Sequence, residues 1–97
     1  GLKHVLQAFA SGADGVILLD DHGGVFAEEA LREHVVQMKK ELKTYGVEPL
    51  RLMSFSTTLP EYNKVQNTFE TFSARISKIG PISDETRAKI RERLGAN

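Results

Sequence analysis

The chain has no cysteine among its 97 residues. This excludes disulfides, thiolate nucleophiles and zinc sites built on sulfur. It has no surplus of charge either, because 13 basic side chains balance 13 acidic ones. Without net charge there is no bulk field that favours nucleic acid or an anionic membrane. No apolar run reaches the roughly 18 residues of a membrane span, and no signal-peptide pattern opens the sequence. We therefore expect a cytoplasmic protein that binds no nucleic acid and does not insert into membranes.

The residues that are present suit one small globular domain. Apolar residues make up 40% of the chain, an ordinary share for a globular protein. A chain of this length folds as one domain and no more. We find no internal repeat, no low-complexity segment and no glycine-rich nucleotide-binding motif.

Periodicity and capping residues predict the order helix, strand, helix, strand, helix, helix. The first two helices are expected over residues 2–11 and 27–45. A third begins at a capping box at Thr58 and ends at Gly80, and a fourth begins at Ser83. The strands are expected over residues 13–19 and 50–55. This alternation predicts an α/β fold with an open parallel sheet, of the flavodoxin-like or Rossmann-like three-layer type. We expect residues 1–81 to form the α/β domain and residues 82–97 a C-terminal helical extension.

Two parallel strands are too few for a stable sheet. The first predicted element in this alternating order is also a helix and not a strand. We infer that an upstream strand or another chain completes the sheet. The protein is then either a homo-oligomer or part of a larger chain.

A polar loop follows the first predicted strand and is the main candidate for a binding site in the sequence. Asp20, Asp21 and His22 could hold a divalent metal, because ligands of open α/β sheets bind beyond the carboxyl ends of strands. A solvated turn explains the same residues more simply. Gly23 and Gly24 could instead cradle a phosphate, but neighbouring acidic residues repel anions.

Other polar and aromatic residues have structural explanations. Asp14 is interpreted as a turn residue at the strand entrance, and His4 and His34 as helix-surface residues. The basic residues of the last helix are interpreted as a solvated face, because no aromatic side chain is interleaved with them. The aromatic stripe with Phe69 and Phe72 fits either core packing or a partner-binding groove.

Two segments carry a family resemblance. Residues 8–19 read Ala-Phe-Ala-Ser-Gly-Ala-Asp-Gly-Val-Ile-Leu-Leu, and residues 45–52 read Tyr-Gly-Val-Glu-Pro-Leu-Arg-Leu. A Ser/Thr stretch and a long helix ending in Gly80-Pro81 follow. Together, over roughly residues 2–81, they resemble the iron–sulfur delta subunit family of methyl-viologen-reducing hydrogenases.

The resemblance implies an electron-transfer setting. The family passes electrons between a hydrogenase or dehydrogenase and a heterodisulfide-reductase-like flavoprotein, to which the domain is sometimes fused. Its two-iron cluster is held by cysteines, but Asp21 and Phe26 stand where two of them are expected. The resemblance therefore implies the fold and the partners, and argues against a cluster in this chain.

Two functions follow as hypotheses. The first is a non-catalytic interaction domain of a redox complex that has lost its cluster, with iron–sulfur centres or FAD in a partner or an upstream region. The second is a metal- or small-ligand-binding domain that uses residues 20–24.

Overall fold

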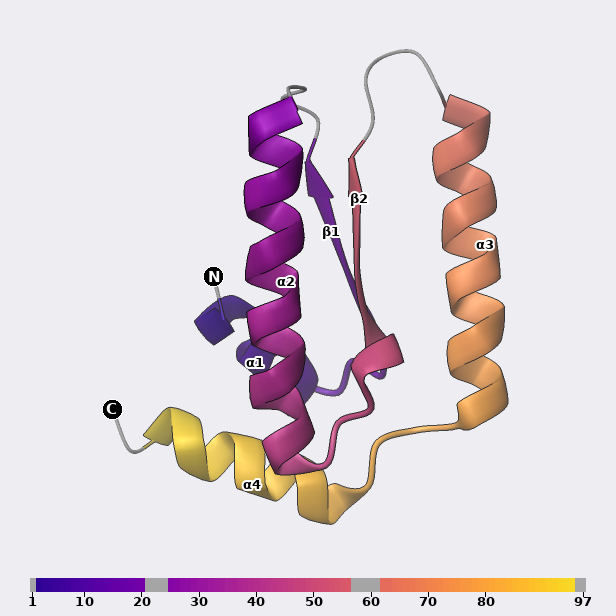
Figure 1. The fold of residues 1–97 in the computed structure, drawn as a ribbon. Coiled ribbons are helices and arrows are strands. Elements are labelled where there is room, and N and C mark those ends of the chain that lie inside the picture. The colour runs from indigo at the N-terminus through magenta and orange to yellow at the C-terminus, as the bar shows by residue number, and fades with distance from the viewer. Residues whose placement is uncertain (1, 21–24, 57–61, 96–97) are drawn as a thin grey trace.

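The structure is a computed structural model that describes residues 2–20, 25–56 and 62–95. Its elements follow the predicted order, with one short 3-10 turn added (Figure 1). They are α1 (Leu2–Ala10), β1 (Val16–Asp20), α2 (Val25–Tyr45), η1 (Pro49–Arg51), β2 (Leu52–Ser56), α3 (Tyr62–Ile79) and α4 (Asp84–Gly95).

The two strands form a parallel sheet that lies between helices. Val16 pairs with Leu52 at one end of the register, and Asp20 pairs with Ser56 at the other. Helix α2 covers one face of the sheet and α3 the opposite face, while α1 and α4 lie near the ends where the strands begin (Figure 1). The predicted α/β class with an open parallel sheet is confirmed; its flavodoxin-like or Rossmann-like type stays a prediction.

Glycines end the first two helices as the sequence indicates. Gly12 and Gly46 have φ angles of 125° and 96°, which side chains rarely tolerate. Beyond each glycine, the next amide turns back on the helix: Ala13 N donates to Ala8 O and Val47 N to Leu42 O, both at 3.1 Å. These bonds satisfy carbonyls that would otherwise lack a partner at the helix end.

The core lies on the α2 side of the sheet, and α1, α2, α4 and both strands contribute to it. Its buried side chains are Val5, Leu6, Phe9, Val35, Met38, Leu42, Val47, Leu52, Ile82 and Ile90. Val16 and Leu18 of β1 pack against it. Ile82 and Ile90 therefore belong to the same core as α1 and α2, and α4 packs directly on α1.

The structure corrects two predicted boundaries. The second strand begins at Leu52, because Pro49 and Leu50 belong to a 3-10 turn in which Arg51 N donates to Glu48 O at 3.0 Å. The first strand begins at Val16, since residues 13–15 form a loop that turns its polar groups toward other segments. The predicted Thr58 cap lies outside the described residues.

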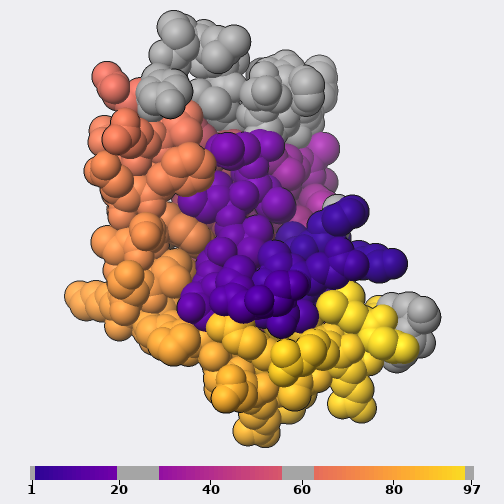
Figure 2. Space-filling model, turned by 180° about the vertical axis from the view of Figure 1, so that it is seen from behind, coloured from indigo at the N-terminus to yellow at the C-terminus, as the bar shows by residue number. Residues whose placement is uncertain are grey.

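One edge of the sheet is open to the surface. Strand β1 pairs with β2 on one side and, within residues 2–20, 25–56 and 62–95, with no strand on the other. Seen from behind, β1 lies at the surface beside α3 (Figure 2). Among the described helices, none is long and apolar enough to cross a membrane.

Candidate functional site

The predicted metal loop lies at the carboxyl ends of both strands. Asp20 is the last residue of β1, but Asp21 and His22 fall outside the described residues. Within the described part of the chain, no group of three histidine or acidic residues could hold a metal ion. Metal binding by Asp20, Asp21 and His22 stays a prediction.

At the opposite end of β1, Asp14 joins three segments that are distant in sequence. Its Oδ1 accepts a hydrogen bond from Ile82 N at 3.1 Å and pairs with the Arg87 guanidinium. Its backbone oxygen accepts from Nη1 of Arg51 at 3.0 Å. Asp14 is therefore more than the local turn residue that the sequence suggested, because it links the β1 entrance to η1 and α4.

Arg87 departs from the interpretation of the basic residues of the last helix as a solvated face. Its Nη1 donates to Phe9 O at 2.7 Å and to Ala13 O at 2.8 Å. Only 12% of its side chain is exposed. A fork of five N–H donors suits several oxygens at once, which explains why arginine stands here. The other basic residues of α4 are exposed as predicted; they are Lys89, Arg91 and Arg93.

Arg51 holds the same end of the sheet from the η1 side. Its side chain is 3% exposed and pairs with Glu48 as well as with Asp14 O. A buried guanidinium is costly unless it is paired and hydrogen-bonded, and these two oxygens supply a carboxylate partner and a carbonyl acceptor. This end of the sheet is thus tied together by two arginines from η1 and α4.

These contacts keep Asp14 ionised. The hydrogen bond from Ile82 N lowers the pKa of Asp14 below its ordinary value of 3.8, and Arg87 and then Arg51 lower it further. Partial burial opposes this shift. An ionised, partnered carboxylate of low basicity is suited to holding structure and poorly suited to acting as a general base.

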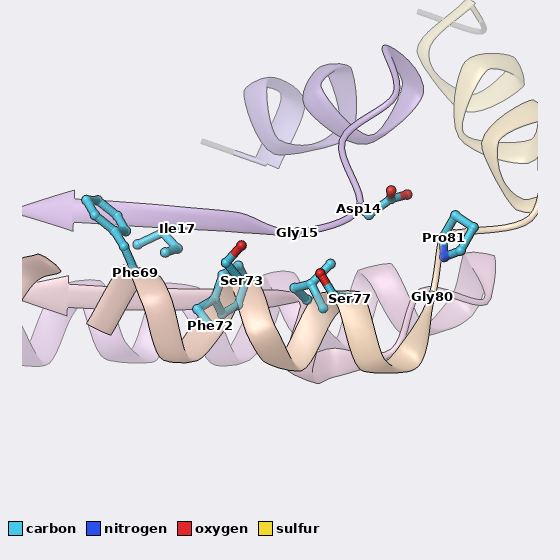
Figure 3. Close-up of a pocket in the computed structure, with 10 residues that line it drawn as sticks. Asp14, Gly15, Ile17, Phe69, Phe72, Ser73, Ser77, Gly80 and Pro81 are labelled. Atoms are coloured by element: carbon cyan, nitrogen blue, oxygen red, sulfur yellow. The ribbon is translucent and has the colours of Figure 1, made fainter. Parts of the chain in front are cut away.

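A groove of about 710 Å³ opens next to this cluster, between β1 and α3 (Figure 3). Asp14, Gly15 and Ile17 form one wall of the groove. The other wall is formed by α3 and the segment that follows it, through Phe69, Phe72, Ser73, Ile76, Ser77, Gly80 and Pro81. The walls combine apolar side chains with the polar residues Asp14, Ser73 and Ser77. The groove is therefore suited to binding a segment that offers both apolar and polar groups.

Gly15 allows α3 to come close to the sheet. A Cβ placed on Gly15 would lie 2.8 Å from Phe72 Cε2 and 2.8 Å from Ile76 Cγ1. Phe72 is buried, Ile76 is half-buried and Phe69 is 39% exposed. Phe72 therefore packs against the sheet, as the core-packing interpretation predicts, and Phe69 lines the groove. Binding of a partner in this groove stays a prediction.

Sequence reasoning missed Arg51, Arg87 and Gly15 as residues that build this region. No local pattern links the two arginines to the loop before β1, because the oxygens that they contact in residues 9–14 lie 37 or more positions away. The Gly-Ala-Asp-Gly run at residues 12–15 is evident in the sequence, but its contacts with α3 and α4 depend on how the helices pack. His4 and His34 are exposed on their helices, as the sequence predicted.

The cluster that the resemblance implies does not fit this chain. Sulfur-rich iron centres prefer thiolate ligands, and the sequence contains no cysteine. The donors that the chain offers are carboxylates and imidazoles, which suit other metals better.

Comparison with known proteins gives a consistent family. The family model described as methyl-viologen-reducing hydrogenase, delta subunit, matches residues 1–80. A ferredoxin:CoB-CoM heterodisulfide reductase subunit from Methanosarcina mazei is 28% identical over 89 residues. A ferredoxin/F(420)H(2)-dependent CoB-CoM heterodisulfide reductase subunit from Methanosarcina acetivorans is 28% identical over 87 residues. These alignments cover 88% and 86% of this chain but only 11% of each relative. The chain thus belongs to the delta subunit family of methyl-viologen-reducing hydrogenases.

Proposed function

We propose that this chain is an interaction domain of an electron-transfer complex of the hydrogenase or heterodisulfide reductase type. The observation that carries the proposal is a family match over residues 1–80 in a chain without cysteine. The domain keeps the family's fold and sequence pattern but offers no thiolate for a cluster. Its role is then to dock, while electrons pass through other parts of the complex.

In this proposal the iron–sulfur centres and FAD belong to partner subunits or to other regions of the same polypeptide. Both relatives are named as heterodisulfide reductase subunits, and most of their length lies outside the matched region. The loop around Asp14 supports a docking role, because Arg51 and Arg87 hold the β1 entrance against η1 and α4. The site of action proposed is the cytoplasm.

Affinity purification of the natural protein from its source cells tests the docking role. We expect flavin- or iron–sulfur-containing subunits to co-purify in a fixed ratio, as shown by mass spectrometry and by iron and FAD content. Purification of the protein alone would contradict the proposal. The absence of a cluster is tested separately: the chain incubated with iron and sulfide should retain no iron after desalting.

The alternative proposal is a metal or small-ligand site at residues 20–24. One observation favours it: Asp20 and Ser56 are paired at the carboxyl ends of both strands, where open α/β sheets bind ligands. Calorimetric titration with Mn²⁺ or Zn²⁺ tests it. Asp21→Ala should abolish binding without lowering the melting temperature, whereas His34→Ala, on the exposed surface of α2, should leave binding unchanged. Equal metal binding by both variants would rule out residues 20–24 as the binding site.

A further inference from the structure

The open edge of β1 is lined by apolar side chains on the α3 side of the sheet. Ile17 lines the groove, and Leu19 follows it on the same face because side chains alternate along a strand. Leu19 is 53% exposed and Phe69, across the groove, is 39% exposed. An unpaired edge with apolar neighbours is a template for another strand.

The arrangement of the helices indicates which strand belongs there. Side chains of α1 and α2 share one core, so both helices lie on the same side of the sheet. Connections between parallel strands are nearly always right-handed. The β1–α2–β2 unit places β2 on one side of β1. A strand that enters β1 through α1, on the same face, must therefore lie on the opposite side, which is the open edge.

We propose that the open edge of β1 and the adjoining groove bind an extended apolar segment that precedes α1 in the natural polypeptide, as a third parallel strand. Alternate side chains of this segment fill the groove against Ile17 and Phe69. The intervening side chains extend the core beside Val16. The sheet order is then upstream strand, β1, β2. This inference concerns the completion of the fold and does not depend on the redox role.

The shape of the groove along β1 suits this occupant. Phe72 and Ile76 lie directly on Gly15, so α3 closes the groove at that end. Farther along β1, Phe69 and Leu19 are left exposed, which leaves room for side chains of an added strand. The matched region is 11% of each relative, so those polypeptides contain ample chain outside it to supply such a segment.

Photo-cross-linking in the natural polypeptide tests the proposal. Phe69 is replaced by p-benzoylphenylalanine, and the cross-linked peptides are mapped by mass spectrometry. We expect a cross-link to residues that precede Leu2 in the same polypeptide. The matched control places the photoreactive residue at Val36, which is 46% exposed on α2, and should not give this product. A cross-link from position 69 to another segment or a separate protein, or no cross-link at all, would overturn the proposal.

Amide hydrogen exchange supplies a second measurement that needs no substitution. Successive amides of a strand point to opposite edges, so β2 alone protects only alternate amides of β1. We expect slow exchange at every amide from Val16 to Leu19 in the natural polypeptide. Fast exchange at alternate positions would show that the edge stays open, and would overturn the proposal.

Discussion

At the scale of single residues, Arg87 of α4 contacts three residues that lie 73 or more positions away in the sequence. Its guanidinium contacts Phe9 O, Ala13 O and the Asp14 carboxylate. Phe9 O lies at the end of α1, where it also accepts from Gly12 N at 3.3 Å, and Ala13 O lies in the loop that follows. One side chain in α4 therefore stabilises the connection between α1 and β1.

We expect Arg87→Ala to lower the free energy of unfolding by about 2 kcal/mol, the usual cost of losing charged hydrogen bonds at a partly buried site. Arg91→Ala is the matched control, because Arg91 is exposed in the same helix. It should change stability by less than about 0.5 kcal/mol. Urea unfolding measures both, and equal effects would show that the Arg87 contacts contribute nothing specific.

The ionisation of Asp14 makes part of the stability depend on pH. Because its pKa in the folded protein is lowered from 3.8, the contribution is fully present above pH 3.8 and is lost as the pH falls through the folded pKa. Asp14→Asn removes the charge but keeps an oxygen that can accept from Ile82 N.

Asp14 is partly exposed, with 34% of its side chain accessible, so we expect the stability difference between wild type and Asp14→Asn to be at most about 1 kcal/mol. It should be constant between pH 7 and 5 and shrink below about pH 4. Denaturant unfolding across this pH range measures it. A difference that grows on acidification would contradict the assigned direction of the pKa shift.

At the scale of elements, the contact between α3 and the sheet depends on the missing side chain of Gly15. A methyl group there would meet Phe72 and Ile76 at 2.8 Å, closer than carbon atoms normally approach. Helix α3 would have to shift away from β1, because both neighbours are packed side chains.

We expect Gly15→Ala to destabilise the protein by about 1–3 kcal/mol, the usual cost of overpacking. Gly95→Ala is the control. No atom outside its immediate surroundings lies within 4 Å of the added carbon, and alanine favours a helix. That variant should be neutral or slightly stabilised. Thermal unfolding followed by circular dichroism distinguishes the two results.

At the scale of the whole molecule, the core continues beyond the family-matched region. The match ends at residue 80, yet Ile82 and Ile90 are buried with Phe9 and Leu42. Helix α4 thus closes the end of the core that α1 and α2 leave open. The division into a domain of residues 1–81 and an extension of residues 82–97 stays a prediction. The contribution of α4 to the free energy of unfolding tests it.

We expect Ile90→Ala to cost about 2–5 kcal/mol, as for other fully buried aliphatic residues. Ile79→Ala, at a position that is 39% exposed in α3, should cost less than about 1 kcal/mol. Equilibrium unfolding in urea compares them. A small effect at Ile90 would indicate that residues 82–97 are an appendage with little part in the core.

The sequence by itself determined the elements and several exclusions. Apolar spacing located α1, α2 and α3 to within a few residues, because a helix that buries one face repeats its apolar residues regardless of its partner. Glycine caps marked Gly12 and Gly46, because positive φ is a local requirement. The absence of cysteine excluded thiolate ligands without any structure.

Only the tertiary structure decided what the polar residues do. Arg87 and Asp14 are 73 positions apart, and no periodic pattern connects residues at that distance. Their pairing arises because α4 packs on α1, which brings the guanidinium to the start of β1. The local sequence indicates which residues favour burial and which favour a turn. Which charged groups then meet depends on how the buried faces pack, and that is a property of the whole chain.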